Sequence, residues 1–284
     1  MTTLTTASPI PSGHVTGQAR LVAWNVWKHC DTAPTRLGLA MFALLPVFAA
    51  AGLLDPRRLA GVSLWDKPMR FAVGLGIYLV SLGLYAAFVS PQGRARRAYR
   101  WPMAAGCAAA ALELFVIAMQ SARGVGSHYN FATPFDAAVY SAMGIGALVL
   151  TAMTLPVAAG IARRPALQPA LGTAMRSALV WGLRLTPVLT LITAGTLSAH
   201  GGHQVGGVGV PPQVLPLFGW LTTAGDLRVP HFFGTHAMHA VPLAVLCLGA
   251  VRPLRRPGVA IVGLLYTLFV LATFAQALAG RPFL

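Results

Sequence analysis

Long apolar runs constrain this chain more than any other feature of its sequence. A helix needs about 20 apolar residues to cross the hydrocarbon core of a bilayer. Only 10% of the 284 residues are charged, against about 25% in soluble domains, so most of the surface cannot face water. Seven runs qualify as spans: residues 37–54, 68–90, 101–120, 135–160, 174–199, 229–250 and 258–280. The sequence therefore predicts an all-α, polytopic transmembrane bundle of about seven helices.

The residues before the first run divide into two segments. Residues 1–17 are rich in Thr, Ser, Pro and Gly and lack the pattern of a cleaved signal peptide, so we expect a disordered tail. In residues 18–36, Leu21, Trp24 and Trp27 recur at helical spacing. This spacing favours an amphipathic segment at the membrane interface over an irregular tail. The remainder, 37–284, is predicted to form one transmembrane domain.

Basic residues set the predicted orientation. In a seven-helix chain, the arginine-rich loops after the second, fourth and sixth runs share one side, which the positive-inside rule makes cytoplasmic. The N-terminus is then inside and the C-terminus outside, with Arg57 and Arg58 as exceptions. The net charge of +15 comes from short clusters that suit anionic lipid, so no nucleic acid partner is expected. We expect a multi-pass protein of a bacterial inner membrane; the oligomeric state is left open.

This orientation places most histidines and acids at the outer face. Ionisable residues at membrane depth are functional candidates by default. The outer set consists of His128, His200, His203, His231, His236, His239, Asp55, Asp66, Asp136 and Asp226. The sequence therefore predicts a polar site near the outer leaflet.

The densest part of this set lies between Gly225 and His239, where the sixth run begins. At about 100° per residue, His231, His236 and His239 fit on one helical face. His200 and His203 close the preceding helix on the same side. These five histidines can supply ligands for a zinc, iron or copper ion, or for haem b, with His128 and Asp226 in support. The spacing HxxxxHxxH matches no specific zinc motif, so a metal-free polar site and purely structural histidines remain alternatives.

Two charges lie well inside the apolar runs. Glu113 and Arg184 fall at depths that an arginine side chain can bridge, so we predict an ion pair between them. Gln120 shares the helix face of Glu113 and suggests a polar track toward the outer site, although helix packing explains it equally well. Arg70, just inside the second run, and Arg228, in the histidine segment, complete the supporting residues.

The segment from Thr133 through Pro134 to Asp136 has the pattern of a helix start. A threonine at the N-cap and an acid three residues later satisfy free backbone N–H groups. We therefore expect Asp136 to cap a helix and not to act in catalysis, and Asp226 can cap the sixth helix in a similar way.

Three segments resemble a group of uncharacterised bacterial seven-helix membrane proteins. They are Gly225–His239, which carries a GDLRxxHFxGxHA-type pattern, Lys67–Phe71 and Ser127–Asn130. The resemblance covers most of the seven-helix region and implies no function. A fainter likeness is to seven-helix zinc hydrolases of the ceramidase and progestin-receptor type. Because the paired histidines here lie on the sixth run and not the last, no residue roles carry over.

Two functional hypotheses follow from these features. The first is a membrane enzyme or redox protein that uses a metal ion or haem and acts on a lipid, quinone or other membrane-dissolved substrate. The second is a non-catalytic membrane sensor or small-solute transporter whose histidines respond to external pH or metal. A retinal protein is not expected, because neither lysine, Lys28 or Lys67, lies in the last run.

Overall fold

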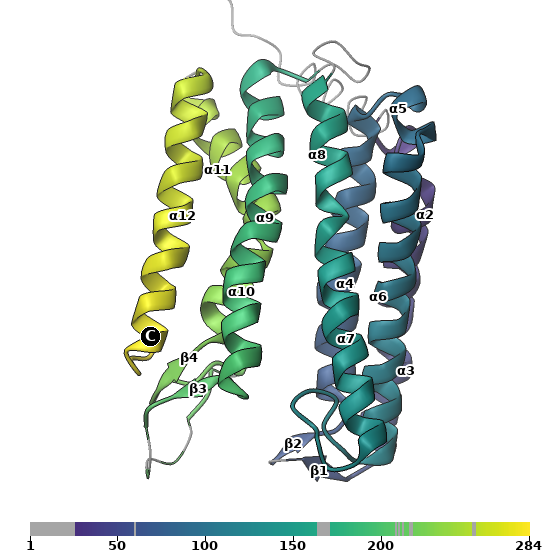
Figure 1. The fold of residues 1–284 in the computed structure, drawn as a ribbon, viewed down its shortest axis with the longest axis vertical. Helices are drawn as coiled ribbons and strands as arrows, with labels where there is room; N and C mark the ends of the chain where they lie inside the picture. Colours follow the sequence, from purple (N-terminus) through teal and green to yellow (C-terminus); the bar gives the residue numbers. More distant parts are fainter. Residues whose placement is uncertain are drawn as a thin grey trace, which may run out of the picture.

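The computed structural model is all-α apart from two short hairpins (Figure 1). It describes residues 26–59, 61–163, 171–207, 209, 211, 213–215, 218–251 and 254–284. The predicted tail, 1–17, and residues 18–25 of the predicted interfacial segment lie outside these residues. The first long helix begins at Thr32, earlier than its apolar run, because Asp31 accepts the backbone N–H of Ala33 and caps it.

In the described residues, six helical segments are long and apolar enough to cross a membrane, and one bent pair makes a seventh candidate. The six are α2–α3 (Thr32–Ala43 and Leu45–Leu54), α4 with η1 (Asp66–Tyr85 and Ala86–Phe88), α6 (Arg97–Arg123), α7–α8 (Pro134–Ala152 and Thr154–Arg163), α9 (Thr173–His200) and α12 (Arg256–Leu278). The bent pair is α10 (Arg228–Thr235) and α11 (Ala237–Val251). The prediction of an all-α chain with several membrane-spanning helices is confirmed.

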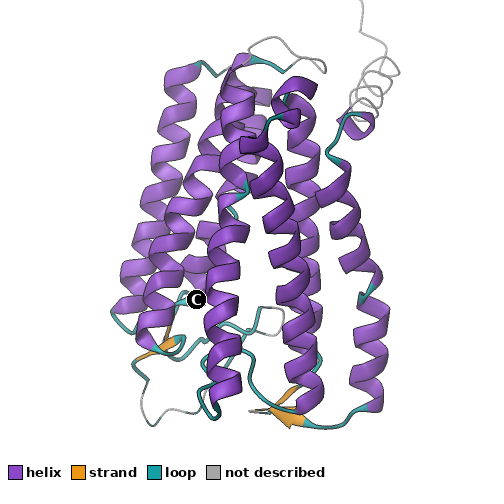
Figure 2. Cartoon of the chain, turned by 45° about the vertical axis from the view of Figure 1, so that its right-hand side comes forward, coloured by secondary structure: helices purple, strands orange, loops and turns teal. Residues whose placement is uncertain are grey.

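The chain runs back and forth between two ends of the bundle (Figures 1 and 2). One end, here called the hairpin end, holds the C-terminus and the hairpins β1–β2 (Arg58–Leu59, Val62–Ser63) and β3–β4 (Gln204–Val205, Gly225–Asp226). The opposite end holds α5 (Pro91–Ala95) and the starts of α6, α9 and α12. We call it the arginine end after the residues at these termini: Arg94, Arg96, Arg97, Arg100, Arg163, Arg176, Arg255 and Arg256. Arg164 and Arg252 lie outside the described residues.

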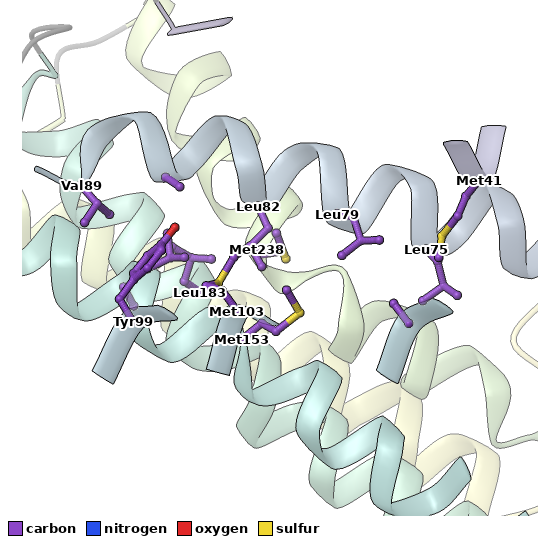
Figure 3. Close-up of a cluster of buried hydrophobic side chains, with 14 of the residues drawn as sticks. Met41, Leu75, Leu79, Leu82, Val89, Tyr99, Met103, Met153, Leu183 and Met238 are labelled. Atoms are coloured by element: carbon purple, nitrogen blue, oxygen red, sulfur yellow. The ribbon is translucent and has the colours of Figure 1, made fainter. Parts of the chain in front are cut away.

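A cluster of buried apolar side chains joins most of the helices (Figure 3). Met41, Leu82, Met103, Met153 and Met238 are all at most 4% exposed. Methionine is unbranched and flexible, so it fills irregular gaps between helices. The outward surface is also apolar, and lipid is as apolar as this core, so close packing between helices stabilises the bundle more than exclusion of water does.

The bent pair α10–α11 turns by 63°, and neighbouring helices satisfy the backbone groups at the bend. Pro242 has no N–H, so it cannot bond the carbonyl of Met238 four residues earlier. Tyr85 Oη donates to that carbonyl at 3.3 Å. Tyr266 Oη donates to the carbonyl of Phe233 at 2.7 Å. An irregular helix is tolerated at membrane depth only when such partners exist.

Helix α9 packs tightly against the bent pair at Gly182. A Cβ built on Gly182 would lie 2.8 Å from the Ala237 carbonyl oxygen and 3.0 Å from Met238 Cα. One turn further along α9, Thr186 Oγ1 accepts the backbone N–H of Met238 at 2.9 Å. The absence of a side chain at Gly182 thus allows the backbone contact that seats α11.

We expect Gly182→Ala to lower the thermal unfolding temperature and Gly195→Ala, on the same helix, not to lower it. The methyl group at 182 must displace α11, an overpacking cost of about 1–3 kcal/mol. The gain in helix propensity is at most about 1 kcal/mol. At Gly195 no heavy atom lies within 4 Å of the built Cβ, so only the gain remains. Thermal melts of both variants in one detergent, followed by near-UV circular dichroism, measure the difference; equal unfolding temperatures would contradict this contact.

Candidate functional site

Three segments that are far apart in the sequence meet at the hairpin end. They are the first turn of α4, the loop 124–133 between α6 and α7, and the segment 225–239 that holds β4, α10 and the start of α11. Lys67 of the first segment contacts His128 of the second, and His128 lies within electrostatic range of His231.

Lys67, His128 and Glu113 form a continuous polar chain. Lys67 Nζ lies 3.2 Å from His128 Nδ1, and His128 Nε2 lies 3.7 Å from Glu113 Oε1. Ser127 Oγ lies 3.1 Å from the same Nδ1. Glu113 is 7% exposed and Ser127 is 3% exposed. The chain therefore leads from the first turn of α4 to a carboxyl group well inside the bundle.

The neighbours of His128 determine which ring nitrogen carries the proton. An ammonium group can only donate, so Nδ1 must accept from Lys67, and the proton must sit on Nε2, facing the Glu113 carboxylate. Burial, followed by the charge of Lys67 and the ring of His231, lowers the pKa of His128 to about 3. The imidazole is therefore neutral at physiological pH and lies between the Lys67 amine and the Glu113 carboxyl group.

Aromatic rings and an unusual backbone conformation hold His128 in place. The rings of Phe71, Tyr129 and Tyr140 have centroids 5.8, 6.4 and 6.1 Å from that of His128. Tyr129 has a φ of 54°, in the left-handed region that bulky residues rarely adopt. Such strain persists only where the surroundings enforce it and is concentrated at functional sites.

An apolar cavity of about 180 Å³ lies between α6 and α7 beside this chain. It is lined by Ala109, Leu112, Glu113, Val116, Val139, Ala142, Met143 and Gly146. Glu113 is the only ionisable residue among these. Leu112 and Ala142 are exposed on the outward surface of the bundle, so the cavity adjoins the side that faces lipid.

The three histidines of the bent pair make separate contacts. His231 Nδ1 lies 3.3 Å from Thr193 Oγ1 on α9. His236 Nδ1 lies 3.2 Å from His239 Nδ1, so these two rings are neighbours, as their spacing predicts. The Nε2 atom of His239 is buried without a hydrogen-bond partner among the described residues. The bent pair thus carries two separate histidine contacts, one from α10 to α9 and one between the bend and α11.

The other two predicted ligands lie elsewhere. His200 ends α9 with an exposed side chain, and His203 Nδ1 lies 3.6 Å from Asp226 Oδ1. In the described part of the chain, no three His, Cys, Asp or Glu side chains lie close enough together to hold a metal ion. The geometry therefore does not support the predicted three-histidine site for zinc, iron or copper. Haem b, which needs only two histidines, stays a prediction.

Asp226 organises the loop between α9 and α10. Its carboxylate is buried and accepts the backbone N–H groups of Leu221 at 2.9 Å and Arg228 at 3.0 Å, and Arg228 Nη2 at 2.6 Å. Burial alone would raise the pKa of Asp226, but the nearby His203 ring and the hydrogen bonds from Arg228 hold it well below its usual range. Asp226 is thus a structural anion that anchors the loop over the hairpin end.

Arg70 and Arg228 hold the same turn of this loop. Arg70 Nη1 donates to the Phe218 carbonyl at 3.3 Å, and Arg228 Nη2 donates to the Gly219 carbonyl at 2.5 Å. Trp220 stacks on Phe218 with ring centroids 4.5 Å apart. Both predicted supporting arginines therefore position backbone and do not line the cavity.

The predicted ion pair between Glu113 and Arg184 is wrong. Glu113 faces His128, whereas Arg184 is exposed on α9. Helix α6 packs on α7 and α4, and α9 packs on α8, α10 and α11. Counting residues gives the depth of each charge but not the rotation of its helix or the neighbour that it meets.

Gln120 belongs to a second polar cluster that joins α6 to α7. Its Nε2 donates to Asp136 Oδ1 at 2.8 Å, and Arg123 Nη1 donates to both Gln120 and Asp136. Thr133 accepts the Asp136 backbone N–H at 3.1 Å and donates to its carboxylate at 2.7 Å. The predicted Thr133 cap is confirmed, whereas the Asp136 carboxylate pairs with side chains and not with free backbone N–H groups. Gln120 serves this junction and not the chain through His128.

No protein-family model, curated protein or solved structure matches the chain.

Lys67 and Thr193 are site residues that the sequence reasoning does not identify. Lys67 follows Asp66 and precedes Pro68, and that pattern indicates only the start of a helix. The available signal is that a lysine begins an apolar run inside one of the three resembling segments. Thr193 gives no such signal, because threonines also occur elsewhere on α9.

We expect Asp226→Asn to loosen the loop between α9 and α10 without unfolding the bundle. Loss of the carboxylate leaves buried donors poorly paired, at a cost of about 1–3 kcal/mol. Hydrogen exchange at the amides of Leu221 and Arg228 should accelerate about tenfold or more, since about 1.4 kcal/mol corresponds to a factor of ten. Asp55→Asn, which alters the exposed Asp55–Arg57 pair, is the matched control and should leave both amides unchanged.

Because the ionised Asp226 carboxylate holds the Leu221 amide, protection of that amide should depend on pH. The folded-state pKa lies below the ordinary value of 3.8, so its stabilisation is complete above about pH 4 and is lost as the pH falls further. Protection of Leu221 that stays constant from neutral pH into strong acid would contradict this assignment.

Proposed function

We propose that the chain is a seven-span protein of a bacterial inner membrane that binds a neutral, lipophilic molecule in the cavity between α6 and α7. The N-terminus lies in the cytoplasm and the C-terminus outside, so the hairpin end faces outward. Support for this orientation comes from the arginines at the opposite end, since basic residues favour the cytoplasmic side. Support for the binding role comes from the cavity itself.

The observation that carries the proposal is an apolar cavity with a carboxyl group in its wall. Ligand sites are typically apolar with a few placed polar groups that orient the ligand. Here Glu113 is that group, and His128, which is not among the lining residues, lies 3.7 Å from its carboxyl group. Because the cavity adjoins the lipid-facing surface between α6 and α7, a ligand can reach it from the bilayer.

The carboxylate of Glu113 limits which head groups a ligand in this cavity can carry. A phosphate or carboxylate head would be repelled by Glu113, whereas a hydroxyl group can donate to its carboxylate. A hydroquinone, which is the reduced form of a quinone, or a lipid alcohol fits this description. Metal chemistry is not part of the proposal, because the described residues offer no group of three ligands.

We expect Gly146→Phe to abolish ligand capture. The built Cβ of Gly146 meets only Ala109 Cβ, at 3.9 Å, so a larger side chain can extend into the cavity. Gly144→Phe is the control, because Gly144 lies on the same helix outside the cavity lining with open space around its Cβ. The probes are a photoreactive isoprenoid hydroquinone and, in a parallel sample, a photoreactive diacylglycerol, each added to the purified protein.

Labelling of α6 or α7 in the wild type should fall about tenfold or more in Gly146→Phe, as expected for the loss of about 1.4 kcal/mol of binding, and persist in Gly144→Phe. The probe that labels identifies the head-group class. If neither probe labels α6 or α7 of the wild type, or if both variants label equally, the proposal is wrong.

The orientation has a separate test. An alkaline phosphatase fused after Leu284 should be active, and a green fluorescent protein fused there should be dark, because the first matures outside the cytoplasm and the second inside it. Fusions truncated after Ala95, at the arginine end, should give the reverse pattern. A fluorescent C-terminal fusion would invert the orientation.

A further inference from the structure

We propose that Lys67, His128 and Glu113 form a proton relay that joins the cavity to the water at the hairpin end. The three residues come from α4, the loop 124–133 and α6, and they stand in line through the two nitrogens of one imidazole ring. The relay deepens the proposed function and rests on it for the cavity being a ligand site. Its proton movements are a property of the chain alone.

The transfer balances in protons and charge. The Lys67 ammonium gives a proton to His128 Nδ1, and the proton on Nε2 passes to the Glu113 carboxylate once these two side chains close from 3.7 Å to hydrogen-bond distance. The products are a neutral amine, a neutral imidazole in its other tautomer and a neutral carboxylic acid. Lys67, which is partly exposed, then takes a proton from water, so the net result is one proton moved from the hairpin end to Glu113.

The surroundings of His128 suit this role. A ring that stayed protonated would store charge and not pass it on, and the low pKa of His128 keeps the ring neutral. The Ser127 hydroxyl lies 3.1 Å from Nδ1 and can donate or accept. It can therefore serve either tautomer while the ring resets.

The charged and titratable groups around the relay come from few elements. Helix α4 contributes Lys67, and α10 contributes Arg228 and His231, which lie in electrostatic range of Lys67 and His128 respectively. Arg228 is neutralised by Asp226. The described α7 residues that line the cavity are uncharged. Among the described residues, Lys67 is the cation whose charge acts on Glu113, and we assign it as the proton donor.

The relay also selects a ligand class. A lipid alcohol keeps its proton, whereas the phenolic hydroxyl of a hydroquinone can exchange one with a carboxylate. A relay that ends at the cavity wall is useful only for a ligand of the second kind. We therefore assign the cavity to a molecule with an acidic hydroxyl group, and the hydroquinone probe should label while the diacylglycerol probe should not.

The experiment follows the Glu113 carboxyl group by time-resolved infrared spectroscopy. The full-length protein is reconstituted in vesicles in one orientation, and the pH is changed on one side at a time. Glu113→Gln identifies the band. In the wild type, the band should respond between about pH 5 and pH 9, a range that brackets groups shifted from their ordinary values, and only when the hairpin-end pH is changed.

Variants of the relay residues then distinguish protonation of Glu113 through the relay from its direct protonation by water. His128→Leu and Lys67→Met should each slow the response at least about 100-fold, the lower range of what a placed acid or base contributes. His200→Leu, exposed at the same end, should respond like the wild type. If His128→Leu does not fold, Lys67→Met carries the test. A response to the arginine-end pH, an unchanged rate in the relay variants, or a band that never responds would each overturn the relay.

The two proposals fail separately. Gly146→Phe fills the cavity but leaves the relay residues in place, so its Glu113 band should still respond while photolabelling is lost. Labelling with the hydroquinone probe without a relay response overturns the relay alone. A relay response without labelling overturns the ligand site alone.

Discussion

A polar group at the depth of a bilayer has no water to bond, so it must find its partner inside the protein. The bent pair α10–α11 depends on this constraint. The carbonyls freed near its bend take hydrogen bonds from Tyr85 and Tyr266 on two other helices, and each group left unpaired would cost several kcal/mol. Those tyrosines therefore fix the bend and, with it, the positions of His231, His236 and His239.

The same constraint explains which parts of the fold are predictable from sequence. Spans depend on length and apolarity, which are local, and the cap at Thr133 and Asp136 depends on four consecutive residues. Side-chain partners across helices depend on how each helix is rotated. Glu113 and Arg184 are reachable by depth alone, yet α6 and α9 have different neighbours, so the carboxyl group meets His128 instead.

The histidines also show that contacts between distant segments cannot be predicted from local sequence patterns. His236 stands at the break between α10 and α11, and His239 lies in the first turn of α11, so the local backbone brings the two rings together. His200 and His203 are separated by Gly201, whose φ of 71° ends α9 and turns the chain. His203 then meets Asp226, while His200 stays exposed. The local sequence does not give the direction of that turn. It also does not give the contact of His203 with Asp226, which lies 23 positions further along the chain. A five-histidine site therefore cannot be inferred from spacing.

The placement of a neutral ring between Lys67 and Glu113 also has an electrostatic consequence. Two opposite charges in direct contact would stabilise each other and fix both protons, and breaking such a buried pair is costly. The imidazole separates the charges by its own width, so Glu113 is only partly compensated at 3.7 Å from Nε2. Its remaining hydrogen-bonding capacity adjoins an apolar cavity with no other ionisable group in its lining. A hydroxyl group supplied from the membrane would complete the pairing that the chain itself leaves unfinished.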